Sequence, residues 1–189
     1  MISEGKNKLN ERFLIDYESF SGKIKRPCVF ISHHKEDSAA CVLVADYLKT
    51  AGLHYYFDQE DADLQSVSGN NRDPGRITKR ILKGLDESTD VICVMSPKTL
   101  TSQWVPFEIG YTYGRKLPTV LTLIGIADHQ LPEFLKATGV DIIRGIESMK
   151  KYVTDLSSDY QILDEVLERT KTFSDVTDHN LRKILEPGK

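Results

Sequence analysis

Short apolar runs alternate with amphipathic stretches along the middle of the chain. The runs at 28–31, 55–57, 91–95 and 120–124 have the length of buried strands, and 141–143 forms a shorter fifth. Between them, apolar residues recur at helical spacing over 41–48, 77–85 and about 105–115. Buried strands that alternate with helices are typical of a parallel sheet covered on both faces. The pattern predicts a three-layer α/β sandwich of about five strands.

The two ends of the chain are more polar than its middle. Residues 1–25 form a polar leader in which Leu9, Phe13 and Tyr17 mark a short amphipathic helix. Residues 149–189 have apolar positions for one or two more helices, among them Leu156 and Ile162. We therefore expect an N-terminal leader at 1–25, a single domain at 26–148 and a C-terminal helical extension at 149–189.

Composition narrows the function classes. The net charge of −3 and the pI near 6.0 lack the basic excess of a nucleic-acid binder. Residues 1–10 contain no apolar core of a signal peptide, and no apolar run has the length of a membrane span. The three cysteines are scattered in apolar sequence without a Cys/His cluster, so we expect buried reduced thiols and no metal. These features predict a cytoplasmic protein that binds neither nucleic acid nor membrane.

Polar side chains follow the predicted strands. Ser32-His33-His34-Lys35 follows the first strand and Asp58 follows the second. Because the carboxyl ends of parallel strands carry the ligand sites of such sheets, these residues are candidates for one site. A serine beside imidazole and ammonium groups suits a ribose or a phosphate. The alternative is a solvent-exposed loop in which Ser38 caps the next helix.

Two further features stand out in the middle of the chain. The polar loop from Gln59 to Gly75 is unusually long, which indicates either a functional loop or a disordered insertion. Trp104 and Glu108 are four residues apart and share one face of a predicted helix. They form either a pocket with an aromatic wall and an acid at its rim, or a core tryptophan beside a solvated glutamate.

Several nucleotide-binding classes are excluded by missing motifs. No GxxxxGK[ST] sequence occurs, which excludes a P-loop, and no GxGxxG occurs, which argues against a hydride-transferring Rossmann enzyme. A phosphorylated receiver domain needs an acidic pair after the first strand and an aspartate after the third. This chain has Ser32-His33 and Ser96 at those places.

With these segments in order, the chain resembles the TIR domain family from about Pro27 to about Ile146. Five segments carry the resemblance: Val29–Ser32, Tyr56–Asp58, Gly75–Ile81, Ser88–Ser96 and Ser102–Ile109. The resemblance implies a flavodoxin-like fold, a central parallel sheet of about five strands with extra terminal helices. The chain departs from the family at Ser66 to Asp73, which lengthens the family's BB loop. One hypothesis is that this insertion blocks the pocket until a trigger arrives.

The resemblance implies one of two functions. Some TIR domains only assemble with other TIR domains, whereas others cleave the nicotinamide–ribose bond of NAD with a glutamate at the position of Glu108. A short chain of this kind is similar to the bacterial stand-alone TIR proteins of Thoeris antiphage defence. These proteins make a cyclic or conjugated ADP-ribose signal that activates a separate effector. A related deoxyribosyltransferase-like enzyme that acts on nucleosides is a third interpretation.

The enzymatic interpretation assigns roles to six residues. Glu108 would be the catalytic carboxylate. The substrate would be bound by Ser32, His33, Lys35, Asp58 and Trp104. NAD is then a substrate, and no cofactor is needed. Self-association through TIR–TIR contacts is also implied, whereas the product, the trigger and the resting oligomer stay open.

Overall fold

The computed structural model describes residues 27–61, 64, 73–114, 119–160, 162, 164, 167–168 and 180–185. Its sheet is wholly parallel, in the order β2-β1-β3-β4-β5, and comprises β1 (Cys28–Ser32), β2 (His54–Tyr56), β3 (Asp90–Met95), β4 (Thr119–Leu123) and β5 (Asp141–Ile143). The chain adds β2 on one side of β1 and the later strands on the other side, so the direction of winding reverses between β1 and β3. Flavodoxin-like sheets open a ligand crevice at this point, at the carboxyl ends of the strands. The predicted fold class is therefore confirmed.

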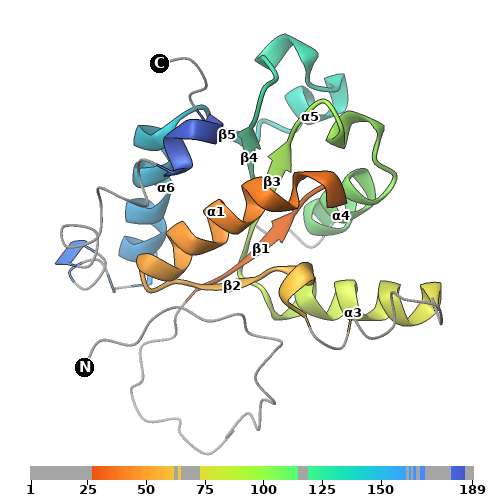
Figure 1. The fold of residues 1–189 in the computed structure, drawn as a ribbon, viewed down its shortest axis with the longest axis horizontal. Coiled ribbons are helices and arrows are strands. Elements are labelled where there is room, and N and C mark those ends of the chain that lie inside the picture. Colours follow the sequence, from red (N-terminus) through yellow and green to blue (C-terminus); the bar gives the residue numbers. More distant parts are fainter. Residues whose placement is uncertain are drawn as a thin grey trace, which may run out of the picture.

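Helices cover both faces of the sheet (Figure 1). One face carries α1 (Ser38–Thr50), α6 (Ile146–Asp159) and the helical residues 180–185, and the other carries α3 (Pro74–Glu87), α4 (Trp104–Gly114) and α5 (Glu133–Ala137). Short 3₁₀ turns follow the first four strands: η1 (Lys35–Asp37), η2 (Asp58–Glu60), η3 (Thr99–Thr101) and η4 (Asp128–Gln130). The loops that leave the carboxyl ends of the strands are thus themselves ordered.

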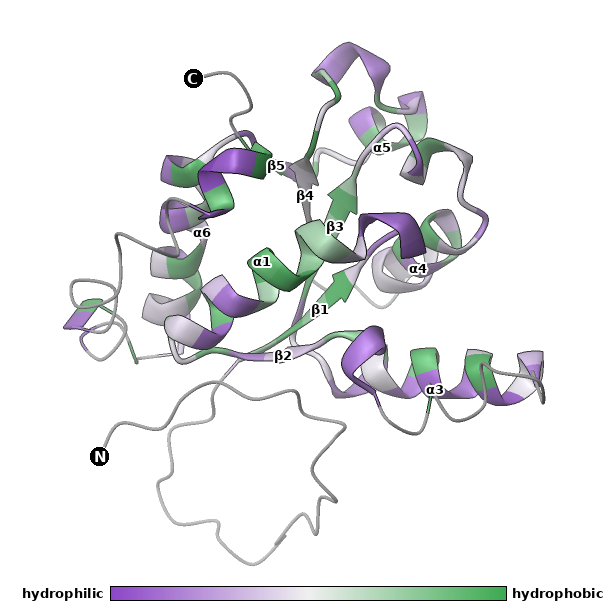
Figure 2. Cartoon of the chain, in the orientation of Figure 1, coloured by the Kyte–Doolittle hydropathy of each residue, from purple (hydrophilic) through white to green (hydrophobic). Residues whose placement is uncertain are grey.

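The core lies against both faces of the two central strands, β1 and β3. Every residue of these strands is buried, and Figure 2 shows most of both in the green of apolar residues. Alternate side chains of β1 point to opposite faces. Val29 and Ile31 pack with α1 and α6, whereas Phe30 packs with α3. This two-sided burial is the physical reason that the strands read as continuous apolar runs.

Some predicted boundaries differ from the structure. The loop after β2 ends at Asp73 rather than at Gly75, because the Asp73 carboxylate accepts the backbone N–H groups of Gly75 (2.9 Å) and Arg76 (3.2 Å) and so begins α3. Ser38 does not cap α1, since Asp37 is the N-cap residue and the Ser38 hydroxyl donates to the Lys35 carbonyl. The short helix α5 was not predicted.

Other predictions concern the ends of the chain. The leader at 1–25 lies outside the described residues, and so does most of the insertion at 66–73. The expected boundary between residues 148 and 149 falls inside α6, whose Ile146, Met149 and Val153 are core side chains. No helix in the described part of the chain is long and apolar enough to cross a bilayer.

Candidate active site

The central contact of the candidate site joins Glu108 to Ser32. Ser32 is the last residue of β1, and its hydroxyl donates a hydrogen bond to Glu108 Oε2 on the second turn of α4. Val105 and Ile109 anchor the buried face of α4 on the core and turn Glu108 inward with it. Only 6% of Glu108 is exposed. The sequence places these residues 76 positions apart, and the parallel order of β1 and β3 brings them together.

Burial changes the acidity of this carboxyl group. Desolvation raises the pKa of Glu108 from its ordinary 4.5 to about 8, although the Ser32 hydroxyl opposes the rise by stabilising the charged form. Like-charge repulsion from the nearby Asp58 carboxyl is a smaller contribution to this raised pKa. A buried acid with a strongly raised pKa at the carboxyl end of a parallel sheet is typical of a functional site.

A second pair, His33 and Asp58, lies beside this contact. His33 follows Ser32 directly, and its Nε2 lies 3.5 Å from Asp58 Oδ1 at the start of η2. Its Nδ1 lies 3.3 Å from the carbonyl oxygen of Ile31, and its ring packs against Phe57 with centroids 5.0 Å apart. Burial raises the pKa of Asp58, and His33 opposes that shift. The structure thus brings together four of the six candidates: Ser32, His33, Asp58 and Glu108.

The environments of Trp104 and Glu108 are the opposite of those in the second interpretation of the sequence. Trp104 is 39% exposed and Glu108 is buried, rather than a core tryptophan beside a solvated glutamate. The Trp104 ring packs edge-on against the exposed Phe107, with ring centroids 5.9 Å apart. The exposed ring thus lies one turn before a buried acid, so Glu108 lies deeper than the rim position that the first interpretation gave it.

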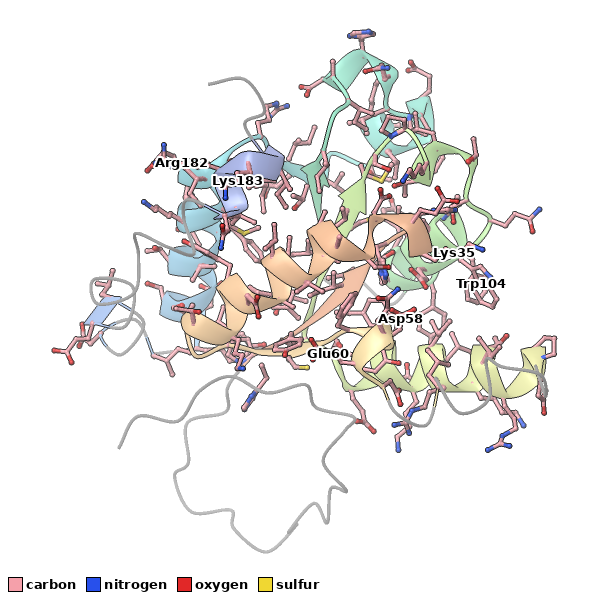
Figure 3. All side chains as sticks on the ribbon, in the orientation of Figure 1. Lys35, Asp58, Glu60, Trp104, Arg182 and Lys183 are labelled. Carbon is pink, nitrogen blue, oxygen red and sulfur yellow. The ribbon has the colours of Figure 1, made fainter. Side chains whose placement is uncertain are left out.

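Lys35 is the least constrained of the candidates. Lys35, Asp58 and Trp104 are the first residues of η1, η2 and α4, and Figure 3 shows them on the same side of the ribbon. The Lys35 side chain is exposed. Its neighbour His34 caps η1 by accepting the Glu36 backbone N–H at 3.3 Å. The structure therefore places Lys35 at the rim, and within the described part of the chain it makes no hydrogen bond or ion pair with the buried candidates.

A buried polar network under η2 positions Asp58. The Arg80 guanidinium of α3 pairs with the Asp61 carboxylate at 2.6 Å, and the Tyr56 hydroxyl donates to that carboxylate at 2.9 Å. Burial alone would raise the pKa of Asp61, but these donors outweigh it and the pKa is lowered. The ring of Tyr56 lies so close to Gly84 that a Cβ there would sit 2.6 Å from the ring. These contacts tie η2 to α3.

Sequence reasoning missed a second network that supports the site. The Ser96 hydroxyl, after β3, donates to Asp37 of η1 at 2.6 Å and accepts the Lys98 backbone N–H at 3.1 Å. The Thr99 hydroxyl accepts the Ser96 backbone N–H at 2.9 Å. This network joins the loops after β1 and β3. Ser96 was visible as a polar strand end, but no sequence signal connected it to Asp37.

A separate hollow lies away from the candidate residues. This cavity of about 380 Å³ lies between η4, α5 and β5, with Leu131, Leu135 and Ile142 in its lining, and none of the six candidates borders it. Among the residues that the structure describes, no group of three or more His, Cys, Asp or Glu side chains is placed to hold a metal ion.

The arrangement is suited to a reaction in which positive charge develops next to Glu108. A carboxylate in a low-dielectric site stabilises a nearby cation far more than it would in water. The Trp104 ring supplies a face for a planar cationic group. Ser32 and the His33–Asp58 pair supply hydrogen-bonding groups for hydroxyls.

One comparison with known proteins bears on the chain. A family model described as TIR domain matches residues 29–156, which include every candidate residue and all five strands except Cys28, the first residue of β1. No curated protein matches the chain.

Proposed function

Because the chain belongs to the TIR domain family, we propose that it cleaves the nicotinamide–ribose bond of NAD with Glu108 as the catalytic carboxylate. The observation that carries the proposal is the burial of Glu108 against the Ser32 hydroxyl, at the switch point of the sheet. In this proposal the ADP-ribose moiety becomes a cyclic or conjugated signalling nucleotide in bacterial antiviral defence. The reaction takes place in the cytoplasm, and a separate effector reads the product.

The chemistry needs one carboxylate and no general acid. Cleavage of a glycosidic bond passes through an oxocarbenium-like state, which carboxylates stabilise. Nicotinamide leaves as a neutral molecule from a cationic ring, so its departure requires no proton. Ionised Glu108 offsets the positive charge that forms on the ribose. Since a protonated Glu108 lacks this effect, the positive charge of the nicotinamide ring must draw its proton off on binding.

The remaining candidates bind the substrate in this scheme. Trp104 lies against the nicotinamide ring, whose cationic character favours an indole face. Ser32, His33 and Asp58 face the ribose hydroxyls, and Lys35 at the rim pairs with the phosphates. NAD is consumed as a substrate, and contacts between copies of the chain complete the assembly.

The direct test is nicotinamide release from NAD by concentrated full-length protein, followed by mass spectrometry of the products. Glu108→Gln keeps the shape of the side chain and loses its charge, so we expect release to fall at least about a hundredfold. Glu133→Gln, on an exposed side chain of α5, is the matched control and is expected to keep full activity. Full activity in Glu108→Gln would show that the catalytic assignment is wrong.

One observation favours a second function, a non-catalytic TIR interaction module. Trp104 and Phe107 form an exposed aromatic pair on α4, and exposed aromatic side chains are enriched at protein interfaces. In that case wild-type protein releases no nicotinamide at any concentration. Trp104→Ala then abolishes binding to partner TIR domains, and there is no catalytic activity for it to change.

A further inference from the structure

The His33 Nε2 and Asp58 Oδ1 atoms face each other at 3.5 Å, which places a proton acceptor on each side of the gap. The Ile31 carbonyl is an acceptor only, so the His33 Nδ1 beside it carries a hydrogen, and the Nε2 atom faces Asp58 Oδ1. Contact with Phe57 holds the ring in this orientation. The His33 side chain is only 3% exposed, and Asp58 is the carboxyl group that faces its Nε2 atom.

The charges around Asp58 favour the uptake of a proton. The ionisable side chains that act on it are His33, Asp61, Glu108, Cys41 and Tyr56. Asp61, which pairs with Arg80, and Glu108 are the like charges. When Glu108 is ionised, it raises the proton affinity of Asp58. Proton uptake by Asp58 is thus easiest in the charge state that the catalytic step requires.

Asp58 also has the access that Glu108 lacks. The Asp58 side chain is 35% exposed, whereas Glu108 is almost covered and already accepts the Ser32 hydroxyl. A group that takes a proton from an incoming molecule must reach both that molecule and the solvent to which the proton is later lost. Of the two carboxyl groups, Asp58 meets both conditions.

We propose that Asp58, oriented by His33, is the general base that deprotonates the molecule replacing nicotinamide on the ribose. This inference rests on the proposed cleavage of NAD. The bond between ribose C1′ and the nicotinamide nitrogen breaks, and its electron pair leaves with neutral nicotinamide. An O–H or N–H nucleophile then bonds to C1′ and its proton passes to the Asp58 carboxylate. His33 is a positioning residue that shares this proton before its release to solvent.

The proposal specifies the class of acceptor. Water, a hydroxyl group and an N–H group each lose a proton when they attack C1′, so each needs the base. A pyridine nitrogen has no proton to lose, so exchange of nicotinamide for another pyridine needs only Glu108. The two reactions therefore separate bond cleavage from acceptor activation.

The experiment compares these two reactions in the full-length wild type and in Asp58→Asn. One assay follows NAD conversion to ADP-ribose products by mass spectrometry, and the other follows exchange of isotope-labelled nicotinamide into NAD. We expect Asp58→Asn to lower product formation about a hundredfold, the usual size of a general-base effect. Exchange also needs NAD to bind, so it falls only by the loss of the Asp58 contact to the ribose, and the ratio of product formation to exchange falls at least about tenfold. Retained exchange also shows that the variant is folded.

The outcomes distinguish a failure of the proposed role of Asp58 from a failure of the proposed NAD cleavage. Equal loss of both reactions in folded Asp58→Asn, or no loss of either, overturns the role of Asp58 as a base and leaves the proposed NAD cleavage standing. A wild type that performs neither reaction overturns the proposed function, and this inference with it.

His33→Gln tests the positioning role separately. It keeps a hydrogen-bonding side chain and removes the atom that shares the proton with Asp58. We expect the pH profile of product formation to shift, whereas the pH profile of nicotinamide exchange keeps its wild-type shape. An unchanged profile would show that Asp58 acts without His33.

Discussion

Glu108 is a carboxyl group that the fold holds out of water, and this has a thermodynamic consequence. Its pKa of about 8 in the folded state exceeds the ordinary 4.5, so the folded protein keeps a proton that the unfolded chain has lost between these two values. The folded state is therefore favoured below pH 4.5, and its stability falls as the pH rises toward 8. A side chain that does not titrate removes this dependence.

We expect Glu108→Gln to gain free energy of unfolding relative to wild type as the pH rises. Its advantage over wild type should be about 3 kcal/mol larger at pH 8 than at pH 5. Chemical unfolding at the two pH values measures the difference. Glu133→Gln, on an exposed side chain, is expected to follow the wild type at both. Parallel stability curves for Glu108→Gln and wild type would show that Glu108 titrates near its ordinary pKa.

Ser32 controls the same carboxyl group through one hydrogen bond. Its hydroxyl lowers the pKa of Glu108, so Ser32→Ala raises that pKa further. If the ionised form is catalytic, kcat/KM of the wild type for NAD rises with an inflection near pH 8, and the inflection of Ser32→Ala lies higher. At a pH below both inflections, the variant holds less of the ionised carboxylate, so its activity is lower than that of the wild type. Ser157→Ala, which removes a buried hydroxyl from α6, is the control and should leave the profile unmoved.

At the scale of elements, the packing of α3 beside η2 depends on a glycine, Gly84, which leaves room for the Tyr56 ring. Tyr56 stacks on Phe30 with ring centroids 5.1 Å apart and lies against Gly84 of α3. An added Cβ at Gly84 would push the Tyr56 ring and, with it, the hydrogen bond from Tyr56 to Asp61. Gly110 of α4 offers a comparison, because nothing lies within 4 Å of a Cβ there.

We therefore expect opposite signs from two identical changes. Gly84→Ala should lower the free energy of unfolding by about 1–3 kcal/mol through overpacking. Gly110→Ala should raise it by about 0.5–1 kcal/mol, because alanine is the better helix former. Urea unfolding of both variants is the measurement. Stabilisation by both changes would mean that the Tyr56 ring moves aside at little cost.

How far the sequence predicts each element depends on its length and burial. The run 91–95 lies within one residue of β3, because a strand buried on both faces leaves a continuous apolar run. The strand at 141–143 was also placed correctly, although Ile143 is its one buried residue. The five-residue helix α5 contributes a single buried residue, Leu135, and this is too short for a helical period. Cap chemistry was decisive at Asp73, where a side-chain hydrogen bond outweighed the turn propensity of Pro74 and Gly75.

At the scale of the whole molecule, the candidate site was predicted in its composition but not in its contacts. Parallel topology indicates which loops meet, so Ser32, Asp58 and Glu108 were expected at one edge of the sheet. Helical spacing fixes the angle between Trp104 and Glu108, yet it does not say which of them faces the core. The buried Val105, Ile109 and Thr112 settle that orientation, and their effect depends on tertiary packing.

The contact between Ser32 and Glu108 also bears on how the protein is made. It closes over 76 residues and requires β1 and β3 to pair, so a chain still emerging from the ribosome has no complete site until α4 is synthesised and docked. An interrupted or prematurely terminated product that lacks α4 lacks the carboxylate altogether. Under the proposed NAD cleavage, unfinished copies of the chain could not consume the cofactor, and consumption would begin only with the completed fold.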